Sequence, residues 1–171
     1  LLLALLQTSS NVDLSVGGKI LDNNGDAMNV RGNHLQIVGL GFGTQSDMIE
    51  VDIASLGADV GTGGIFFLSY HDITITGIMS LGDVYIESLT GSITVDRDIT
   101  GLDVTLIAFD TIFLNDLLHY DPQVTLEADR MIGNMIPSRD GGEEEEEKRE
   151  MDHMFLNHMD DYVHNFKLYD W

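Results

Sequence analysis

Apolar and polar residues alternate along much of the chain before residue 136, which is the period of a β-strand with one buried face. Val84 and Ile86, for example, lie between the polar residues Asp83, Tyr85 and Glu87. Glycines fall between such runs, at positions 77, 82, 91 and 101, where a chain can turn sharply because glycine lacks a Cβ atom. The pattern predicts short strands joined by turns.

The alternating segments repeat about every twenty residues. Three columns of like residues result: Val84, Val104 and Val124; Ile86, Leu106 and Leu126; Ser88, Ala108 and Ala128. A further column joins Ile93, Ile112 and Ile132, and Ile65, Phe67 and Ser69 extend the first three columns backwards. At least four units therefore share one plan, and the spacing is less even before residue 60.

A unit of this size cannot bury its own apolar face, so the units must stack. The equal polarity of the repeats favours a parallel β-solenoid of about 20-residue coils over residues 1–136, with the small column at an inner corner and a rod about 30 Å long. An antiparallel sandwich or barrel is the alternative. It requires hairpins, and Asn24-Gly25 is the only two-residue Asn-Gly signal.

The two ends of the chain differ from this pattern. Leu1 to Leu6 is too short to cross a bilayer and is interpreted as a strand or chain end, with the core of a truncated signal peptide as the alternative. Because there is no starting Met, we expect a fragment or a processed product. Residues 137–150 contain Glu143 to Glu147 and read as an acidic linker.

Residues 151–171 are predicted to form a C-terminal amphipathic helix. Its apolar stripe consists of Met151, Met154, Phe155, His158, Met159, Tyr162, Val163 and Phe166. Such a helix could cap the last coil, whose unpaired strand groups invite aggregation. A docking helix for a partner and a disordered tail are the alternatives.

Charge narrows the range of partners. The 171 residues include 29 acidic and 8 basic side chains, a formal net charge of −21 at pH 7. Binding to nucleic acid or to an anionic membrane surface is therefore not expected, because both need a basic face. The chain has no cysteine, which excludes disulfides, thiol nucleophiles and cysteine-ligated metals.

Two motifs match known ligand-binding loops only in part. Gly39, Gly41 and Gly43 follow a predicted strand like a phosphate loop, but Thr44 replaces the next glycine and an alternating strand pattern follows instead of a helix. Asp22, Asn24 and Asp26 have the spacing of the first half of a calcium loop. The second half is missing, with Ala27 and Asn33 in place of glycine and glutamate, and Asx residues also form turns by themselves.

Other titratable residues form further candidate sites. His153, His158 and His164 are spaced five and six apart, so they do not share one helix face. Asp83 and Asp103 would stack in adjacent coils, and Asp96 and Asp98 flank Arg97 beside a turn. Carboxylate rows of this kind can act as acid and base or bind calcium, but acidic columns more often provide solubility. No catalytic residue, metal ligand or cofactor is assigned from the sequence.

Several segments together resemble the repeats of giant bacterial surface proteins of the filamentous-haemagglutinin-like kind. Gly18 to Val30 fits a turn of the form I-x-D-x-N-G-x-A-x-N-V, and a strand at Leu35–Val38 and a Gly-x-Gly step at Gly41–Gly43 follow. Residues 49–56, 63–68 and 72–76 look like its continuation. The resemblance covers about residues 11–132. It implies a right-handed parallel β-helix in a secreted or cell-surface protein, serving as an adhesive stalk or scaffold.

The sequence therefore predicts an all-β, non-enzymatic, structural or adhesive repeat segment of a large secreted or cell-surface bacterial protein. It is expected to act as a monomeric unit of a longer chain, outside the cell, with a host or matrix protein or glycan as partner. The alternative is a solenoid polysaccharide lyase or hydrolase that uses surface carboxylates, with or without calcium. A third interpretation, an acidic domain of a salt-loving organism, shares the fold.

Overall fold

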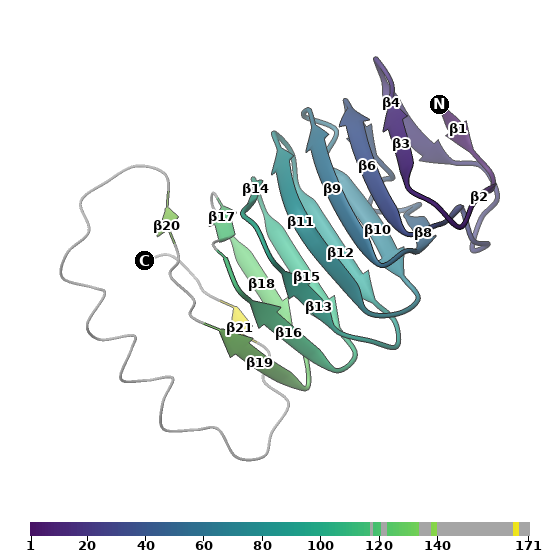
Figure 1. Ribbon diagram of the computed structural model, residues 1–171. Helices are drawn as coiled ribbons and strands as arrows, with labels where there is room; N and C mark the ends of the chain where they lie inside the picture. Colours follow the sequence, from purple (N-terminus) through teal and green to yellow (C-terminus); the bar gives the residue numbers. More distant parts are fainter. Residues whose placement is uncertain (117, 121–122, 134–137, 140–165, 168–171) are drawn as a thin grey trace, which may run out of the picture.

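The chain winds into a parallel β-solenoid of about six turns, whose strands lie one above another in two broad faces (Figure 1). The computed structural model describes residues 1–116, 118–120, 123–133, 138–139 and 166–167. All the described regular elements are strands, so the expected all-β class is confirmed for this part of the chain.

Strands of the first face form one sheet: β1 (Leu2–Leu3), β2 (Leu6–Gln7), β4 (Lys19–Asp22), β5 (Val30–Arg31), β7 (Gly41–Phe42), β8 (Ile49–Asp52), β10 (Ile65–Ser69), β12 (Val84–Ser88), β15 (Val104–Ala108), β18 (Val124–Glu127) and β21 (Phe166–Lys167). The second face consists of β3 (Val12–Ser15), β6 (His34–Gly39), β9 (Ser55–Val60), β11 (Ile73–Ser80), β13 (Ile93–Val95), β14 (Ile99–Gly101), β16 (Thr111–Leu114), β17 (Leu118–Tyr120), β19 (Arg130–Gly133) and β20 (Ser138–Arg139).

The predicted columns are confirmed where the repeat is regular. Val84 pairs with Val104 and Val104 with Val124, and Ile65, Phe67 and Ser69 pair with Val84, Ile86 and Ser88. Every strand ladder among β1 to β20 is parallel, so the antiparallel sandwich is excluded for these elements.

The inward side chains of both faces form one continuous apolar core. Phe42, Phe67, Ile86 and Leu106 are all fully buried. Ser69 and Ser88 are buried at the inner corner as predicted, and both donate a hydrogen bond to the carbonyl oxygen of His71, at 3.0 and 2.9 Å. A small side chain at this corner thus lets the chain turn closely and also satisfies a turn carbonyl.

One predicted column is wrong by a residue. Ile112 pairs with Met131, and Phe113 with Ile132. Ile112 is fully buried, Met131 packs against the core and Ile132 is 44% exposed. The one-residue shift places Ile132 on the opposite side of its strand from Met131, because strand side chains alternate.

Uneven spacing in the first coils has a structural cause. Leu6 lies 24 residues before its partner Val30, whereas Ile49 lies 18 residues before its partner Phe67. Residues 23–29 separate β4 from β5, and residues 43–48 separate β7 from β8. In the next coil one strand, β10, lies beside both β7 and β8, because Ile65 pairs with β7 and the residues from Phe67 onwards pair with β8.

The predicted C-terminal helix is not supported. Residues 151–165 and 168–171 lie outside the described residues, and so do the tail histidines His153, His158 and His164. Most of the expected linker 137–150 also lies outside them. The described part of the tail, β21, is a strand that pairs antiparallel with β18, Phe166 opposite Leu126. Strand pairing there satisfies main-chain groups at the edge of β18, which a helix could cover but not pair.

None of the described residues forms a helix long and apolar enough to cross a membrane.

The shift at Ile132 gives a paired test of the register. Ile112→Ala should lower the free energy of unfolding by about 2–5 kcal/mol, because it leaves a cavity in the core. Ile132→Ala, at an exposed position, should lower it by less than about 1 kcal/mol. Urea unfolding of the two variants measures both values. Equal losses would contradict the observed register and restore the column Ile93, Ile112 and Ile132.

Candidate functional site: a buried acidic cluster

A group of polar side chains is buried where the first face is interrupted by the segments 23–29 and 43–48. We call the buried Asp22, Asn29 and Glu50, together with the exposed Asp26 and Asp47 on these two segments, the Glu50 cluster. Asp22 is 8% exposed, Asn29 is fully buried and Glu50 is 6% exposed. Burying a polar side chain costs free energy unless hydrogen-bond partners or ligands compensate for the lost water. The burial of these three side chains therefore needs a physical explanation.

Asp22 begins a tight turn. Its Oδ1 accepts hydrogen bonds from the backbone N–H groups of Asn23 and Asn24, at 2.7 and 3.0 Å, and Gly25 has a positive φ of 61°. Burial acts to raise the pKa of Asp22, but hydrogen bonds from Asn29 and from the backbone of Asn24, Asn23 and Gly25 outweigh it, so the net pKa is lowered. Asp22 is therefore held in its ionised form.

Asn29 connects three successive coils. Its Nδ2 lies within hydrogen-bonding distance of Asp22 Oδ1, at 2.5 Å, and of the Leu3 carbonyl oxygen, at 3.0 Å. Its Oδ1 accepts from the backbone N–H of Glu50 at 2.8 Å, and its own N–H donates to the Glu50 carbonyl at 2.9 Å. The asparagine thus ties β1, β4 and β8 together through one side chain.

Glu50 lies on β8 between Ile49 and Val51, both fully buried. Its Oε2 is buried and has no hydrogen-bond partner. Burial, opposed in part by a backbone hydrogen bond and reinforced by the negative charges of Asp22, Asp26 and Asp47, raises its pKa from 4.5 to about 7. The cluster thus contains one carboxyl held ionised and another whose pKa lies near neutral pH.

The segment 43–48 is closed by its own backbone. Thr44 and Asp47 exchange two main-chain hydrogen bonds, at 2.9 and 3.1 Å, and Gly43 has a φ of 71°. A Cβ on Gly43 would lie 2.2 Å from the Phe66 carbonyl oxygen, and one on Gly41 would lie 2.9 Å from Gly63. These glycines therefore allow coils to stack closely. Strand β8 follows this segment, as the alternating sequence pattern predicted.

The half calcium loop does not assemble as its spacing suggests. Asp22 Oδ1 is used in the turn, Asn24 Oδ1 lies 2.6 Å from Asn29 Nδ2, and Asp26 is exposed. Within the described residues, no three His, Cys, Asp or Glu side chains are already arranged to hold a metal ion. Asp22 and Asn24 still belong to the cluster region, so sequence spacing found part of it. Asn29 and Glu50 were missed.

The predicted carboxylate pair does stack. The backbone N–H of Asp103 lies 3.4 Å from Asp83 Oδ1, and Asp103 Oδ1 is buried without a hydrogen-bond partner. Val104 donates its N–H to the Gln123 carbonyl, so the next residue in the row is uncharged. Asp96, Arg97 and Asp98 are exposed in the turn between β13 and β14, and Asp96 Oδ1 accepts from Asn115 Nδ2 at 2.8 Å. That contact joins adjacent coils.

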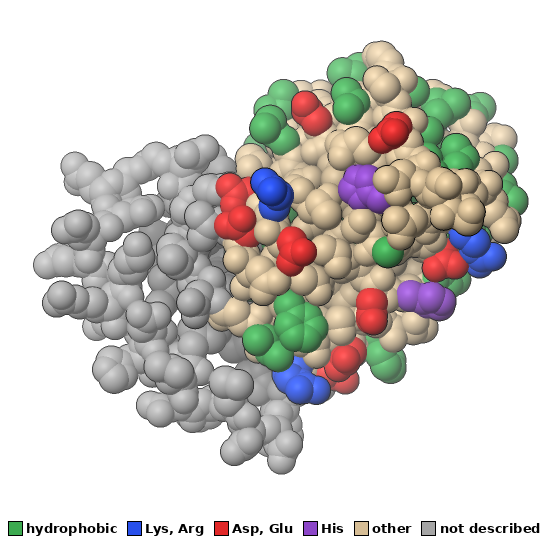
Figure 2. Space-filling view, viewed as in Figure 1, with side chains coloured by type: hydrophobic (Ala, Val, Ile, Leu, Met, Phe, Trp, Pro, Cys, Tyr) green, Lys and Arg blue, Asp and Glu red, His purple; other side chains and the backbone are tan. Residues whose placement is uncertain are grey.

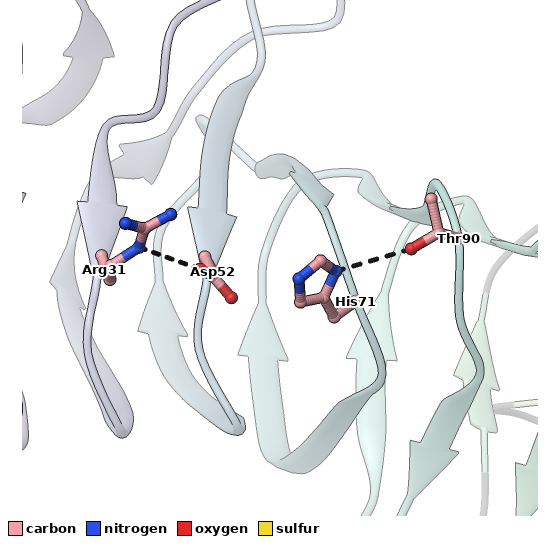
Figure 3. Close-up of polar contacts among 4 residues, drawn as sticks. All are labelled: Arg31, Asp52, His71 and Thr90. Atoms are coloured by element: carbon pink, nitrogen blue, oxygen red, sulfur yellow. Dashed lines mark hydrogen bonds and ion pairs between the residues drawn. The ribbon is translucent and has the colours of Figure 1, made fainter.

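A second polar line runs along one edge of four successive coils (Figure 3). Arg31 Nε donates to Asp52 Oδ2 at 2.9 Å, and farther along His71 Nδ1 lies 3.5 Å from Thr90 Oγ1. The Arg31 side chain is 51% exposed, so the pair contributes little stability. These residues lie 21, 19 and 19 positions apart in the sequence, close to the length of one coil, so the stacking of coils brings them into line.

Comparison with known protein families, with curated proteins and with solved structures finds no match. The solenoid supports a β-helix repeat protein, and the finer resemblance to filamentous-haemagglutinin-like proteins is taken up below as a proposal.

The raised pKa of Glu50 predicts an unusual pH dependence of stability. The folded state binds the Glu50 proton more tightly than the unfolded state, so stability should fall as pH rises from about 4.5 to 7. The full effect is roughly 3 kcal/mol, because one pKa unit corresponds to about 1.4 kcal/mol. Glu50→Gln, which mimics the neutral form, should remove this loss. Asp22 acts in the opposite sense and only at pH values below its ordinary pKa of 3.8.

The measurement is the free energy of urea unfolding between pH 5 and 8 in buffer with EDTA. Asp13→Asn is the matched control, since Asp13 is an exposed carboxylate on β3. If Glu50→Gln keeps the wild-type pH profile, the unpartnered carboxyl is not the source of the loss.

Proposed function

We propose that this chain is a structural segment of a large exported bacterial surface protein of the filamentous-haemagglutinin-like kind. In this proposal its coils wind right-handed, as the sequence resemblance implies and as parallel crossover connections strongly prefer. Its role is to give mechanical reach and to present turns and outward strand faces to a host or matrix partner, protein or glycan, outside the cell.

The observation that carries the proposal is the in-register stacking of coils along one axis. Strand β12, for instance, pairs through all five of its residues with β10 on one side and β15 on the other. Each added coil advances the structure by about 4.8 Å. A chain built in this way converts sequence length into distance, which suits a stalk.

An exposed apolar edge supports the recognition role. Four residues occupy the same turn after β6, β9, β11 and β14, and three are large and exposed: Leu40 (52%), Leu81 (66%) and Leu102 (50%), with Gly61 between Leu40 and Leu81. Val38 and Met79 on the same rim are also exposed. We call these five side chains the leucine rim. Figure 2 shows hydrophobic side chains along the upper edge of the molecule, where β6, β9 and β11 end in Figure 1. The exposed Asp59 lies between Val38 and Met79 in the coil that separates them, so the rim is apolar with one acidic interruption. Large exposed apolar patches rimmed by polar residues typically mark protein contacts.

The lyase or hydrolase alternative rests on one observation, the stacked pair Asp83 and Asp103 with a buried, unpartnered oxygen on Asp103. Paired carboxylates can act as acid and base. Only the turnover of a polysaccharide distinguishes this reading from the structural one.

The proposal predicts binding that depends on the leucine rim. The full chain should bind to immobilised extracellular-matrix protein or host-cell glycan, and the double variant Leu81→Asp, Leu102→Asp should bind at least about tenfold more weakly, because exposed apolar anchors carry much of an interface's energy. Its thermal stability should change little, since both positions are exposed. Binding is measured by surface plasmon resonance.

Leu5→Asp is the matched control, because Leu5 is 59% exposed in the turn between β1 and β2, away from the leucine rim. Equal loss in all variants would point to general stickiness instead of a defined surface. Release of soluble oligosaccharides from a polysaccharide, abolished by Asp103→Asn or Asp96→Ala, would replace the structural proposal with the enzymatic one.

A further inference from the structure

We propose that the Glu50 cluster binds a single divalent cation of the calcium class between the segments 23–29 and 43–48. This inference is independent of the proposed adhesive function, because it rests on the packing of two adjacent coils.

The first argument is the unpartnered oxygen of Glu50. Only 6% of the Glu50 surface is exposed, and its Oε2 accepts no hydrogen bond. Leaving a buried carboxylate oxygen unpaired is costly. The charged groups that act on it, Asp22, Asp26 and Asp47, are all negative and increase that cost. A bound divalent cation would offset two of these negative charges and would supply the partner that Oε2 lacks.

The second argument is the chemistry of the donors. The cluster offers carboxylate oxygens from Asp22, Asp26, Asp47 and Glu50, without cysteine or histidine. Hard oxygen donors suit Ca²⁺ or Mg²⁺ and disfavour soft metals. Ca²⁺ accepts six to eight oxygens in irregular geometry, whereas Mg²⁺ demands a near-ideal octahedron and releases water reluctantly. Donors from two loops of different length favour Ca²⁺.

The third argument is that half of the site is fixed and half can adjust. Asp22, Asn24 and Asn29 are held by the turn and by the hydrogen bonds of Asn29, and Glu50 is held on β8. Asp26 and Asp47 are exposed on the two segments. Since no three carboxylates of the described chain already meet at metal-binding positions, the cation must draw Asp26 and Asp47 inwards. Binding would thus join the two segments across successive coils.

The test is calcium binding by the full chain at pH 8, measured by equilibrium dialysis with radioactive calcium and by thermal unfolding in EDTA, Mg²⁺ or Ca²⁺. We expect one saturable site and a rise of several degrees in the unfolding midpoint with Ca²⁺, because a ligand that binds only the folded state stabilises it. Mg²⁺ should give a smaller rise. Glu50→Gln should abolish the saturable site, and Asp47→Asn should weaken it by at least about tenfold, since each removes a ligand.

Asp13→Asn is the control for nonspecific attraction of cations to a chain with a net charge of −21. It should leave the site intact. Asp47→Asn is informative even if Glu50→Gln alters folding, because Asp47 is exposed. The proposal is overturned if wild type shows no saturable site, or if Glu50→Gln and Asp47→Asn bind Ca²⁺ as tightly as Asp13→Asn does.

Discussion

The structure depends on the main-chain hydrogen bonds that each coil must form with the coils beside it. A single coil has two edges of unpaired N–H and C=O groups, and only a neighbour of the same shape, in register, can satisfy them along the whole strand. This requirement places Val84, Val104 and Val124 above one another and gathers their side chains in a common core. Outward positions are released from the constraint, so they differ between coils and can hold functional groups.

The regular part of this arrangement could be predicted, because like residues in successive coils are visible as a repeat. The prediction failed where counting alone was ambiguous. Ile93 and Ile112 pair at a spacing of 19, whereas Ile73 and Ile93 pair at 20. Apolar residues stand at both 131 and 132, and only packing selects Met131. The tail stripe included Phe166 in a helix, but this residue pairs with Leu126, a partner forty residues away that no local period reveals.

The candidate site was partly visible for a related reason. Asp22 and Asn24 attracted attention through their spacing, and the same stretch from Gly18 to Val30 also contains Gly25 and Asn29. Several of these residues form the turn and its hydrogen bonds, so the motif indicates a backbone conformation more directly than a binding function. Glu50 lacked such a signal. A glutamate between two apolar residues of a strand normally faces water, and its burial arises from tertiary packing between distant parts of the chain.

The segments that separate β4 from β5 and β7 from β8 have a consequence for how such a protein can change. One coil has 24 residues between paired positions and another has 18, yet each advances the solenoid by one layer. The additional residues of the longer coil lie in the segments between strands. Insertions at these corners would therefore alter what the surface carries while the distance spanned stays constant. The length of the solenoid and the residues on its surface can therefore vary independently. The number of coils sets the length, and the segments between strands set the surface residues.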